Sequence, residues 1–130
     1  MSRFDAYRAD YERDGVVLIP GAFADWADRL NAAFDRLIAR VKGGEPLPRS
    51  ADADAAVGDS TGDHDPGTGR AHLRNAAPHD DALWQWVAHS PAAEIVGTLT
   101  RSTKVQFWYD LWFCKEPSDS PAEGATPWHH

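Results

Sequence analysis

The stretch of sequence that decides the fold lies near the end of the chain and reads Val105-Gln106-Phe107-Trp108-Tyr109-Asp110-Leu111-Trp112-Phe113-Cys114. Successive side chains of a strand point to opposite faces of a sheet, and large side chains here occupy both alternating sets of positions. The pattern predicts a strand over residues 103–115 with both faces covered. A lone strand cannot form a sheet, so this one indicates the entrance to a larger β structure that the 130 residues do not complete.

Helical patterns precede this strand. The clearest covers residues 24–41, where large apolar side chains recur every three or four positions and charged residues fill the other face. Asp25 is its expected N-cap and Gly43 its expected stop. Shorter helices are predicted over residues 4–13, 80–89 and 92–99.

The remaining segments are predicted as strands or loop. Residues 16–19 form a continuous apolar run closed by Pro20-Gly21, which is typical of a buried strand. Residues 70–75 fit a short strand. Residues 43–69 are rich in Gly, Pro, Asp and Ala and predict a long exposed loop or a disordered insert.

This order of elements, helices first and a long two-faced strand last, predicts an α+β fold in which residues 1–130 form the N-terminal part of a single domain. Hydrophobic residues make up 42% of the chain and include six Trp, five Phe and three Tyr, which is enough for a packed core.

Charge and composition exclude several classes of function. The net charge of −7 opposes binding to nucleic acid or to an anionic membrane. Cys114 is the one cysteine, so no internal disulfide can form, and we expect a cytoplasmic protein. The N-terminus lacks the apolar segment of a signal peptide, and no apolar run is long enough to span a membrane. The expected partner is a small-molecule substrate.

The last residues of the chain, Thr126-Pro127-Trp128-His129-His130, follow the predicted strand through a turn-rich loop. A His that enters a strand, followed two positions later by a carboxylate, is the first part of a 2-His-1-carboxylate iron site. His129 fits the first position, and the acid would be residue 131. The competing interpretation is a flexible tail or the stub of a tag.

The strand ending at Lys115-Glu116-Pro117, together with Trp128-His129, resembles the phytanoyl-CoA dioxygenase family. In that family a strand ending in Lys-x-Pro leads through a variable loop to Trp-His-x-Asp. Residues 11–23 are also similar, because in the family a short helix and an Asp-Gly-apolar strand lead into a long helix. The resemblance covers the whole chain in order and is weakest over residues 43–69.

This resemblance implies an Fe(II), 2-oxoglutarate-dependent oxygenase built on a jelly roll, or double-stranded β-helix, of which these residues form the N-terminal helices and first strands. It places His129 as the first metal ligand, makes His130 a spacer, and directs Lys115 toward the 2-oxoglutarate carboxylate. Trp128 would line the pocket beside the metal. The acid, the second His and a further 2-oxoglutarate-binding base of the family lie beyond residue 130, and no catalytic residue is assigned.

The expected function is therefore that of an N-terminal portion of an oxygenase that hydroxylates a small organic or acyl substrate. Alone, this portion is expected to be inactive and to self-associate through exposed apolar strand faces. Asp at position 131 would complete a hydroxylase site, whereas a small residue there would suit a halogenase of the same fold.

Two alternatives come from other classes of protein. One is a non-enzymatic α+β domain that binds a protein through a Trp-rich surface. The other is a zinc or nickel binder in which His129 and His130 converge with His72, His79 or His89. Several residues also have structural interpretations. Lys115 would be a solvated lysine at a strand end, Trp84 and Trp86 packing residues on different helix faces, and Cys114 unreactive. Asp110 is either a satisfied buried acid or a pocket residue, and the structural role is favoured.

Overall fold

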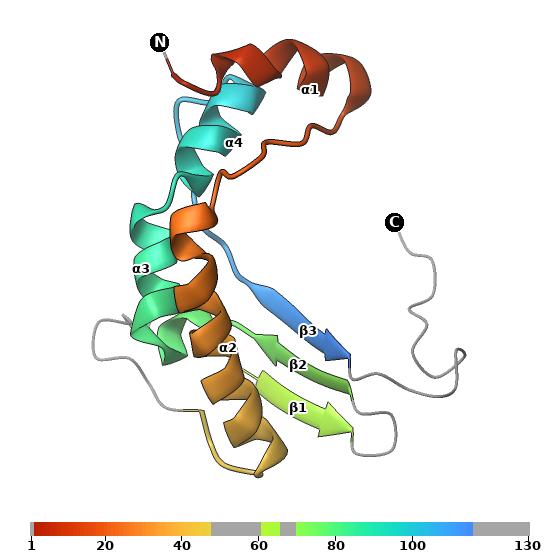
Figure 1. Ribbon diagram of the computed structural model, residues 1–130, viewed down its shortest axis with the longest axis vertical. Helices are drawn as coiled ribbons and strands as arrows, with labels where there is room; N and C mark the ends of the chain where they lie inside the picture. Colours follow the sequence, from red (N-terminus) through yellow and green to blue (C-terminus); the bar gives the residue numbers. More distant parts are fainter. Residues whose placement is uncertain (1, 48–60, 66–69, 116–130) are drawn as a thin grey trace.

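The computed structural model describes residues 2–47, 61–65 and 70–115. Two short 3-10 turns, η1 and η2, each lead directly into an α-helix, and a third, η3, follows the second strand. The elements in chain order are η1 (Asp5–Tyr7), α1 (Arg8–Asp14), η2 (Ala24–Trp26), α2 (Ala27–Lys42), β1 (Thr61–Asp65), β2 (Arg70–Arg74), η3 (Ala77–His79), α3 (Asp81–His89), α4 (Ala92–Thr100) and β3 (Leu111–Lys115). Helices and an antiparallel sheet together confirm the α+β class. Figure 1 shows α2 and α3 beside the sheet, with α1 and α4 at the far end of the molecule.

The sheet has the strand order β1-β2-β3, and both pairings are antiparallel. Directly opposite residues in such a ladder share a face of the sheet. Ala71 and Leu73 of β2 therefore point the same way as Trp112 and Cys114 of β3, which lie opposite them. This side, the covered face, packs against α2.

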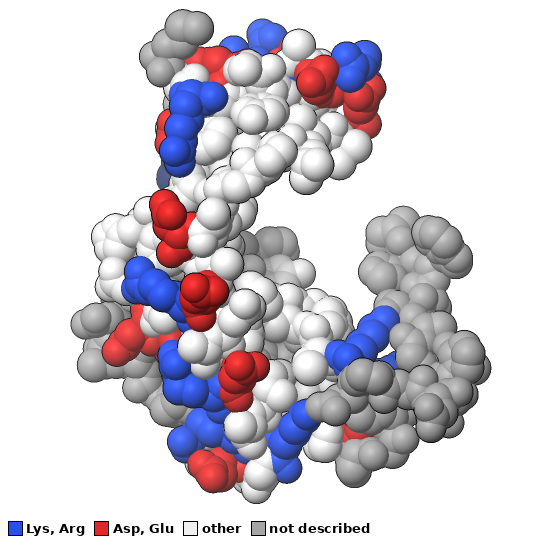
Figure 2. Space-filling view, in the orientation of Figure 1, with Lys and Arg blue, Asp and Glu red and all other residues white. Residues whose placement is uncertain are grey.

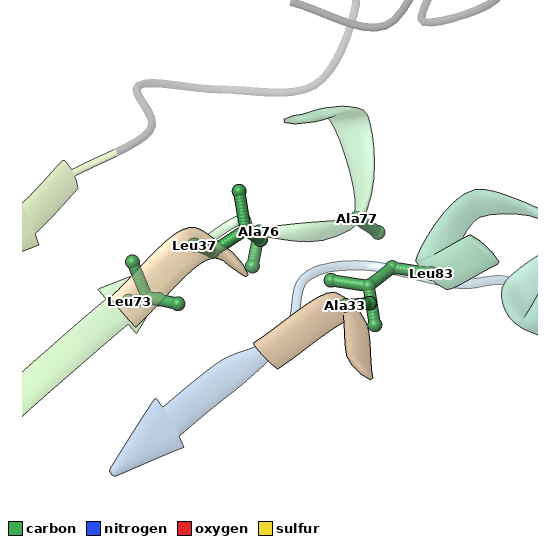
Figure 3. Close-up of a cluster of buried hydrophobic side chains, with 6 residues drawn as sticks. All are labelled: Ala33, Leu37, Leu73, Ala76, Ala77 and Leu83. Carbon is green, nitrogen blue, oxygen red and sulfur yellow. The ribbon is translucent and has the colours of Figure 1, made fainter. Parts of the chain in front are cut away.

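The main core lies between α2, α3 and the covered face. Ala33 and Leu37 of α2 contact Leu73 of β2 and Leu83 of α3 in one buried cluster (Figure 3). At its edge the ring of Phe34 lies 3.8 Å from the ring of Trp112, measured between centroids. The apolar stripe that predicted α2 is therefore the surface that holds the sheet.

The prediction of an unbroken loop over residues 43–69 is wrong at β1. Its sequence, Thr61-Gly62-Asp63-His64-Asp65, lacks an apolar pattern, but the segment pairs with β2 along its whole length. Gly62 allows α2 to lie close, because a Cβ at this position would meet Cγ2 of Val41 at 2.6 Å. Sheet pairing thus outweighs the weak strand propensity of the sequence. Residues 48–60 and 66–69 lie outside the described residues.

The strand predicted over residues 103–115 is shorter in the structure and begins only at Leu111. Arg74 is the last partner on β2, and Asn75 then turns the chain away with a φ of 54°. Residues 103–110 therefore have no strand to pair with in the described chain. Phe113 is 70% exposed, so one face of β3 is uncovered in these 130 residues, in agreement with the apolar strand faces expected to be exposed in this chain alone.

The buried strand predicted over residues 16–19 does not form. No strand pairs with this segment in the described part of the chain, and Leu18 is 82% exposed. Val17 and Ile19 instead pack against a second, smaller apolar cluster of Phe4, Ile95 and Leu99. The apolar run therefore serves helix packing rather than a sheet.

The four predicted helices are confirmed with small shifts at their ends. Asp25 is not the N-cap of α2, because the chain enters this helix through η2 and Trp26 takes the N-cap position without a side-chain hydrogen bond. Gly43 is confirmed as the stop, and its amide donates to the carbonyl of Ala39 at 3.0 Å. No helix in the described ranges has the length and apolar character needed to cross a membrane.

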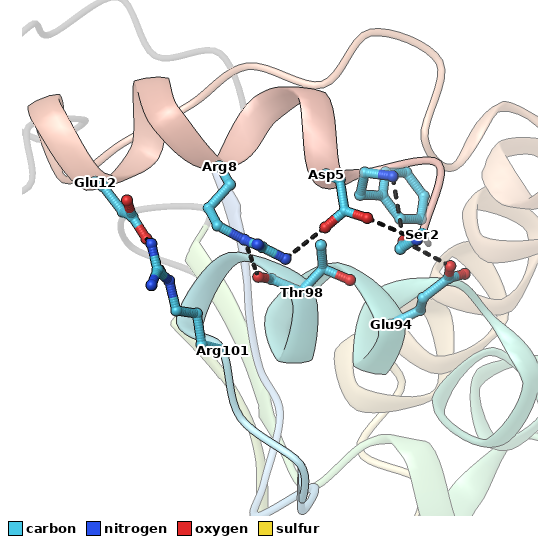
Figure 4. A network of polar contacts seen from close by, with 8 residues as sticks. Ser2, Asp5, Arg8, Glu12, Glu94, Thr98 and Arg101 are labelled. Carbon is cyan, nitrogen blue, oxygen red and sulfur yellow. Dashed lines mark hydrogen bonds and ion pairs between the residues drawn. The ribbon is translucent and has the colours of Figure 1, made fainter.

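Polar contacts add to the small cluster in joining α1 to α4 (Figure 4). Nε of Arg8 donates to the carbonyl oxygen of Thr98 at 3.0 Å, and Arg101 pairs with Glu12 at 2.6 Å. Ser2 donates its hydroxyl to Glu94 at 2.8 Å. Exposed ion pairs typically contribute less than about 1 kcal/mol, so the apolar cluster provides most of the stabilisation.

Candidate functional site on the open face of the sheet

The side of the sheet that faces away from α2 carries a group of charged and ionisable side chains. We call it the open face; the register gives it eight described side chains: Asp63 and Asp65 of β1, Arg70, His72 and Arg74 of β2, and Leu111, Phe113 and Lys115 of β3. Three of these are cations although the chain as a whole has a net charge of −7. By contrast, Figure 2 shows acidic and basic side chains interspersed along the outer surface of α2.

Charged and apolar residues on the open face are arranged in rows across the strands. Asp65, Arg70 and Lys115 form one row, and Asp63, His72 and Phe113 form the next. The ring of His72 lies 6.1 Å from the ring of Phe113, measured between centroids. The face therefore offers cations beside apolar surface, which is a suitable combination for binding an organic anion.

Lys115 is the predicted cofactor-binding residue, and the structure places it on the open face as the last residue of β3. It lies directly opposite Arg70, so their Cβ atoms are about 5 Å apart. Like charges at opposite positions repel unless negative charge lies nearby. Asp65 provides a carboxylate directly opposite Arg70 on its other side.

The predicted metal ligand, His129, lies outside the described residues, as do Trp128 and His130. Within residues 2–47, 61–65 and 70–115, no three His, Cys, Asp or Glu side chains converge in a way that could hold a metal ion. His72, His79 and His89 therefore do not form a zinc or nickel site with each other or with neighbouring described acids. His129 as an iron ligand stays a prediction.

Asp110 forms the structural contacts expected of a satisfied acid, and it also lines the apolar pocket described below, so both interpretations of this residue hold. Its carboxylate accepts hydrogen bonds from the amides of Ala76 at 2.7 Å and Ala77 at 3.0 Å, and from Nε1 of Trp112 at 2.7 Å. Its carbonyl oxygen accepts the amide of Asn75 at 2.9 Å. Asp110 thus fixes the start of β3 against the end of β2 and sets the position of every residue that follows it on β3.

Sequence reasoning missed an apolar pocket of about 580 Å³ between the helices and the chain that leads into β3. Val105, Trp108, Tyr109 and Leu111 line it from one side, and Trp86 and Val96 from the other. The indole of Trp108 is 84% exposed. The cluster of aromatic residues before β3 was visible in the sequence, but the same pattern also predicted a longer strand.

The two tryptophans of α3 have different surroundings, as their spacing predicted. Trp84 packs on the main core, whereas Trp86 lies 5.8 Å from the ring of Phe23 and lines the apolar pocket. Cys114 lies half-buried on the covered face, opposite Ala71, and is a free thiol. Neither the open face nor the pocket includes it.

Comparison with known proteins gives one match. The family model described as phytanoyl-CoA dioxygenase (PhyH) matches residues 11–130, which is most of the chain and confirms the resemblance seen in the sequence. No curated protein and no solved structure matches the chain. The chain therefore belongs to the phytanoyl-CoA dioxygenase family, a family of the oxygenase kind.

Proposed function

We propose that this chain forms part of an Fe(II), 2-oxoglutarate-dependent oxygenase that hydroxylates a small organic or acyl substrate. Family membership supports the reaction class. The structural observation that carries the proposal is the position of Lys115 on the open face, directly opposite Arg70. The same arrangement suits a jelly roll in which α2 covers the outside of the sheet and the open face lines the interior.

The cations at this end of the open face fit 2-oxoglutarate. A guanidinium donates paired hydrogen bonds in the geometry of a carboxylate, and an ammonium adds a compact positive charge. Arg70 and Lys115 would therefore hold a carboxylate of 2-oxoglutarate, and the neighbouring Phe113 would keep water away from one side of it. Hydrogen bonds to charged partners are stronger where water is excluded.

The described residues alone do not form an iron site. In the proposal, His129 is its first ligand and His130 points away, because residues two apart on a strand share a face while the residue between them does not. When bound with 2-oxoglutarate, iron would supply the oxidising power for hydroxylation of a C–H bond.

The alternative of a non-enzymatic protein-binding domain has less support, because the chain belongs to an oxygenase family. The exposed aromatic residues that suggested it are concentrated around the apolar pocket. A pocket is equally suited to a small apolar substrate.

Replacing Lys115 tests the proposed function. In the native protein loaded with Fe(II), Lys115→Met removes the charge but keeps the length of the side chain. We expect 2-oxoglutarate to bind about tenfold more weakly, because one charge-assisted interaction is lost. The measurement is a titration of 2-oxoglutarate under argon, paired with an assay for succinate formed in air.

The matched control is Lys104→Met, at an exposed lysine outside the sheet, which should leave the affinity unchanged. An unaltered dissociation constant in Lys115→Met would remove this lysine from the site. Absence of succinate formation by the unmodified native protein, with Fe(II), 2-oxoglutarate and candidate substrates supplied, would contradict the proposed reaction itself.

A further inference from the structure

The apolar pocket and the open face meet at one place in the molecule. Leu111 lines the pocket and also lies directly opposite Arg74 in the ladder between β2 and β3. The guanidinium of Arg74 lies 5.7 Å from the centre of the ring of Tyr109, which is another residue of the pocket lining. Arg74 is not itself part of the pocket lining, but it contacts a residue of that lining and so lies beside the pocket at its sheet end. The lining is mostly apolar and includes one acid, Asp110, whose carboxylate already accepts three hydrogen bonds from Ala76, Ala77 and Trp112.

Arg74 differs from the other arginines near the sheet in its interactions. Arg36 pairs with Asp80 at 2.7 Å, and Arg40 pairs with Glu45 at 3.3 Å. The side chain of Arg74 instead contacts the ring of Tyr109, and none of the ion pairs described above includes it. A guanidinium held over an aromatic ring keeps its hydrogen-bond donors available at its edge.

From this geometry we propose that the substrate is a small carboxylic acid with an apolar or aromatic body. Its carboxylate binds Arg74, and its body lies in the pocket against Trp108, Tyr109 and Val105. This inference rests on the proposed oxygenase function, whose substrate class it names. Arg74 is then a specificity-determining residue, separate from the pair of Lys115 and Arg70 at the other end of β2.

A carboxylate suits this position better than a phosphate. One guanidinium matches a single carboxylate with two parallel hydrogen bonds. Asp63 lies on the same face of the sheet, two residues from Thr61, which pairs with Arg74. Its negative charge would repel a dianion more strongly than a monoanion. The exposed indole of Trp108 provides a flat apolar surface for the rest of the ligand.

Binding can be tested without any turnover. In the native protein treated with a chelator and free of 2-oxoglutarate, tryptophan fluorescence is titrated with 3-phenylpropanoate and with 3-phenylpropanamide, its uncharged counterpart. We expect the carboxylate to bind about tenfold more tightly than the amide. Arg74→Gln should abolish this preference while leaving the affinity for the amide unchanged, which shows that the pocket is still folded.

Two further variants sharpen the assignment. Trp108→Ala should weaken binding of both probes by a similar factor, because it removes apolar contact only. Arg13→Gln, at an exposed arginine of α1, should retain the full preference for the carboxylate. Phenyl phosphate should bind no more tightly than 3-phenylpropanoate.

Equal affinity of the unmodified protein for the acid and the amide would overturn the inference, as would a preference that survives in Arg74→Gln. A preference that follows Arg74 supports the site even if the protein forms no succinate, in which case only the proposed reaction fails. Succinate formation without any preference for the acid leaves the reaction standing and overturns the inference.

Discussion

The two faces of the sheet differ although they are built from the same strands. On β2 the sequence Arg70-Ala71-His72-Leu73-Arg74 alternates, so that Ala71 and Leu73 are buried against α2 while the three basic residues point the other way. One face provides apolar burial, and the other provides charge and exposed surface. The alternation of a single five-residue strand therefore separates the side chains that stabilise the fold from the charged side chains of the open face.

The largest effect is expected at the covered face. Leu37→Ala removes a fully buried side chain that packs against β2, and should lower the free energy of unfolding by about 2–5 kcal/mol. Chemical denaturation of the 130-residue chain, followed by circular dichroism, measures the change.

Leu18→Ala is the matched control, since it makes the same chemical change at a residue that is 82% exposed. The unfolding free energy should then change by no more than about 0.5 kcal/mol. Similar losses in the two variants would mean that the core between α2 and the sheet does not dominate stability, and the comparison of the two faces would fail.

The helices of this fold were predictable because each has an apolar stripe with helical spacing. β1 was not, because residues 61–65 contain no large apolar side chain and form a strand only through pairing with β2. The opposite failure occurred at residues 16–19, where a strongly apolar run has no partner strand. Local pattern identifies helices, whereas a strand depends on a partner distant in the sequence.

The candidate site was predictable in part for the same reason. Lys115 was identified from its place after an alternating strand and from the resemblance to the family, and the structure puts it on the open face. Arg74 was not, because an arginine in a short strand is ordinarily a solvated residue. Only the register, which sets Arg74 opposite Leu111, joins it to the apolar pocket.

An intermediate effect is expected at Asp110, which lies just before β3 and positions both faces of that strand. Asp110→Ala leaves two backbone amides and the indole N–H of Trp112 without their acceptor. The unfolding free energy should fall by about 1–3 kcal/mol, measured by the same denaturation experiment.

Asp63→Ala is the matched control for this change, because Asp63 is an exposed acid on the open face. Its expected effect is no more than about 0.5 kcal/mol. If Asp110→Ala proved as harmless as Asp63→Ala, the carboxylate would not fix the start of β3, and the placement of Leu111 opposite Arg74 would lose its support.

A small effect on stability is expected at Phe113, which lies on the open face of β3. Phe113 is 70% exposed, and Thr is also well suited to a strand, so Phe113→Thr should change the unfolding free energy by no more than about 0.5 kcal/mol.

The same change should reduce self-association of the 130-residue chain, because it removes exposed apolar surface beside Leu111. Sedimentation velocity measures the association. Trp112→Thr, one residue earlier, should instead destabilise the fold by more than about 2 kcal/mol, because the ring of Trp112 packs against the ring of Phe34 on the covered face. A loss of that size in Phe113→Thr would show that the open face is packed rather than available, and would remove it as the site of binding.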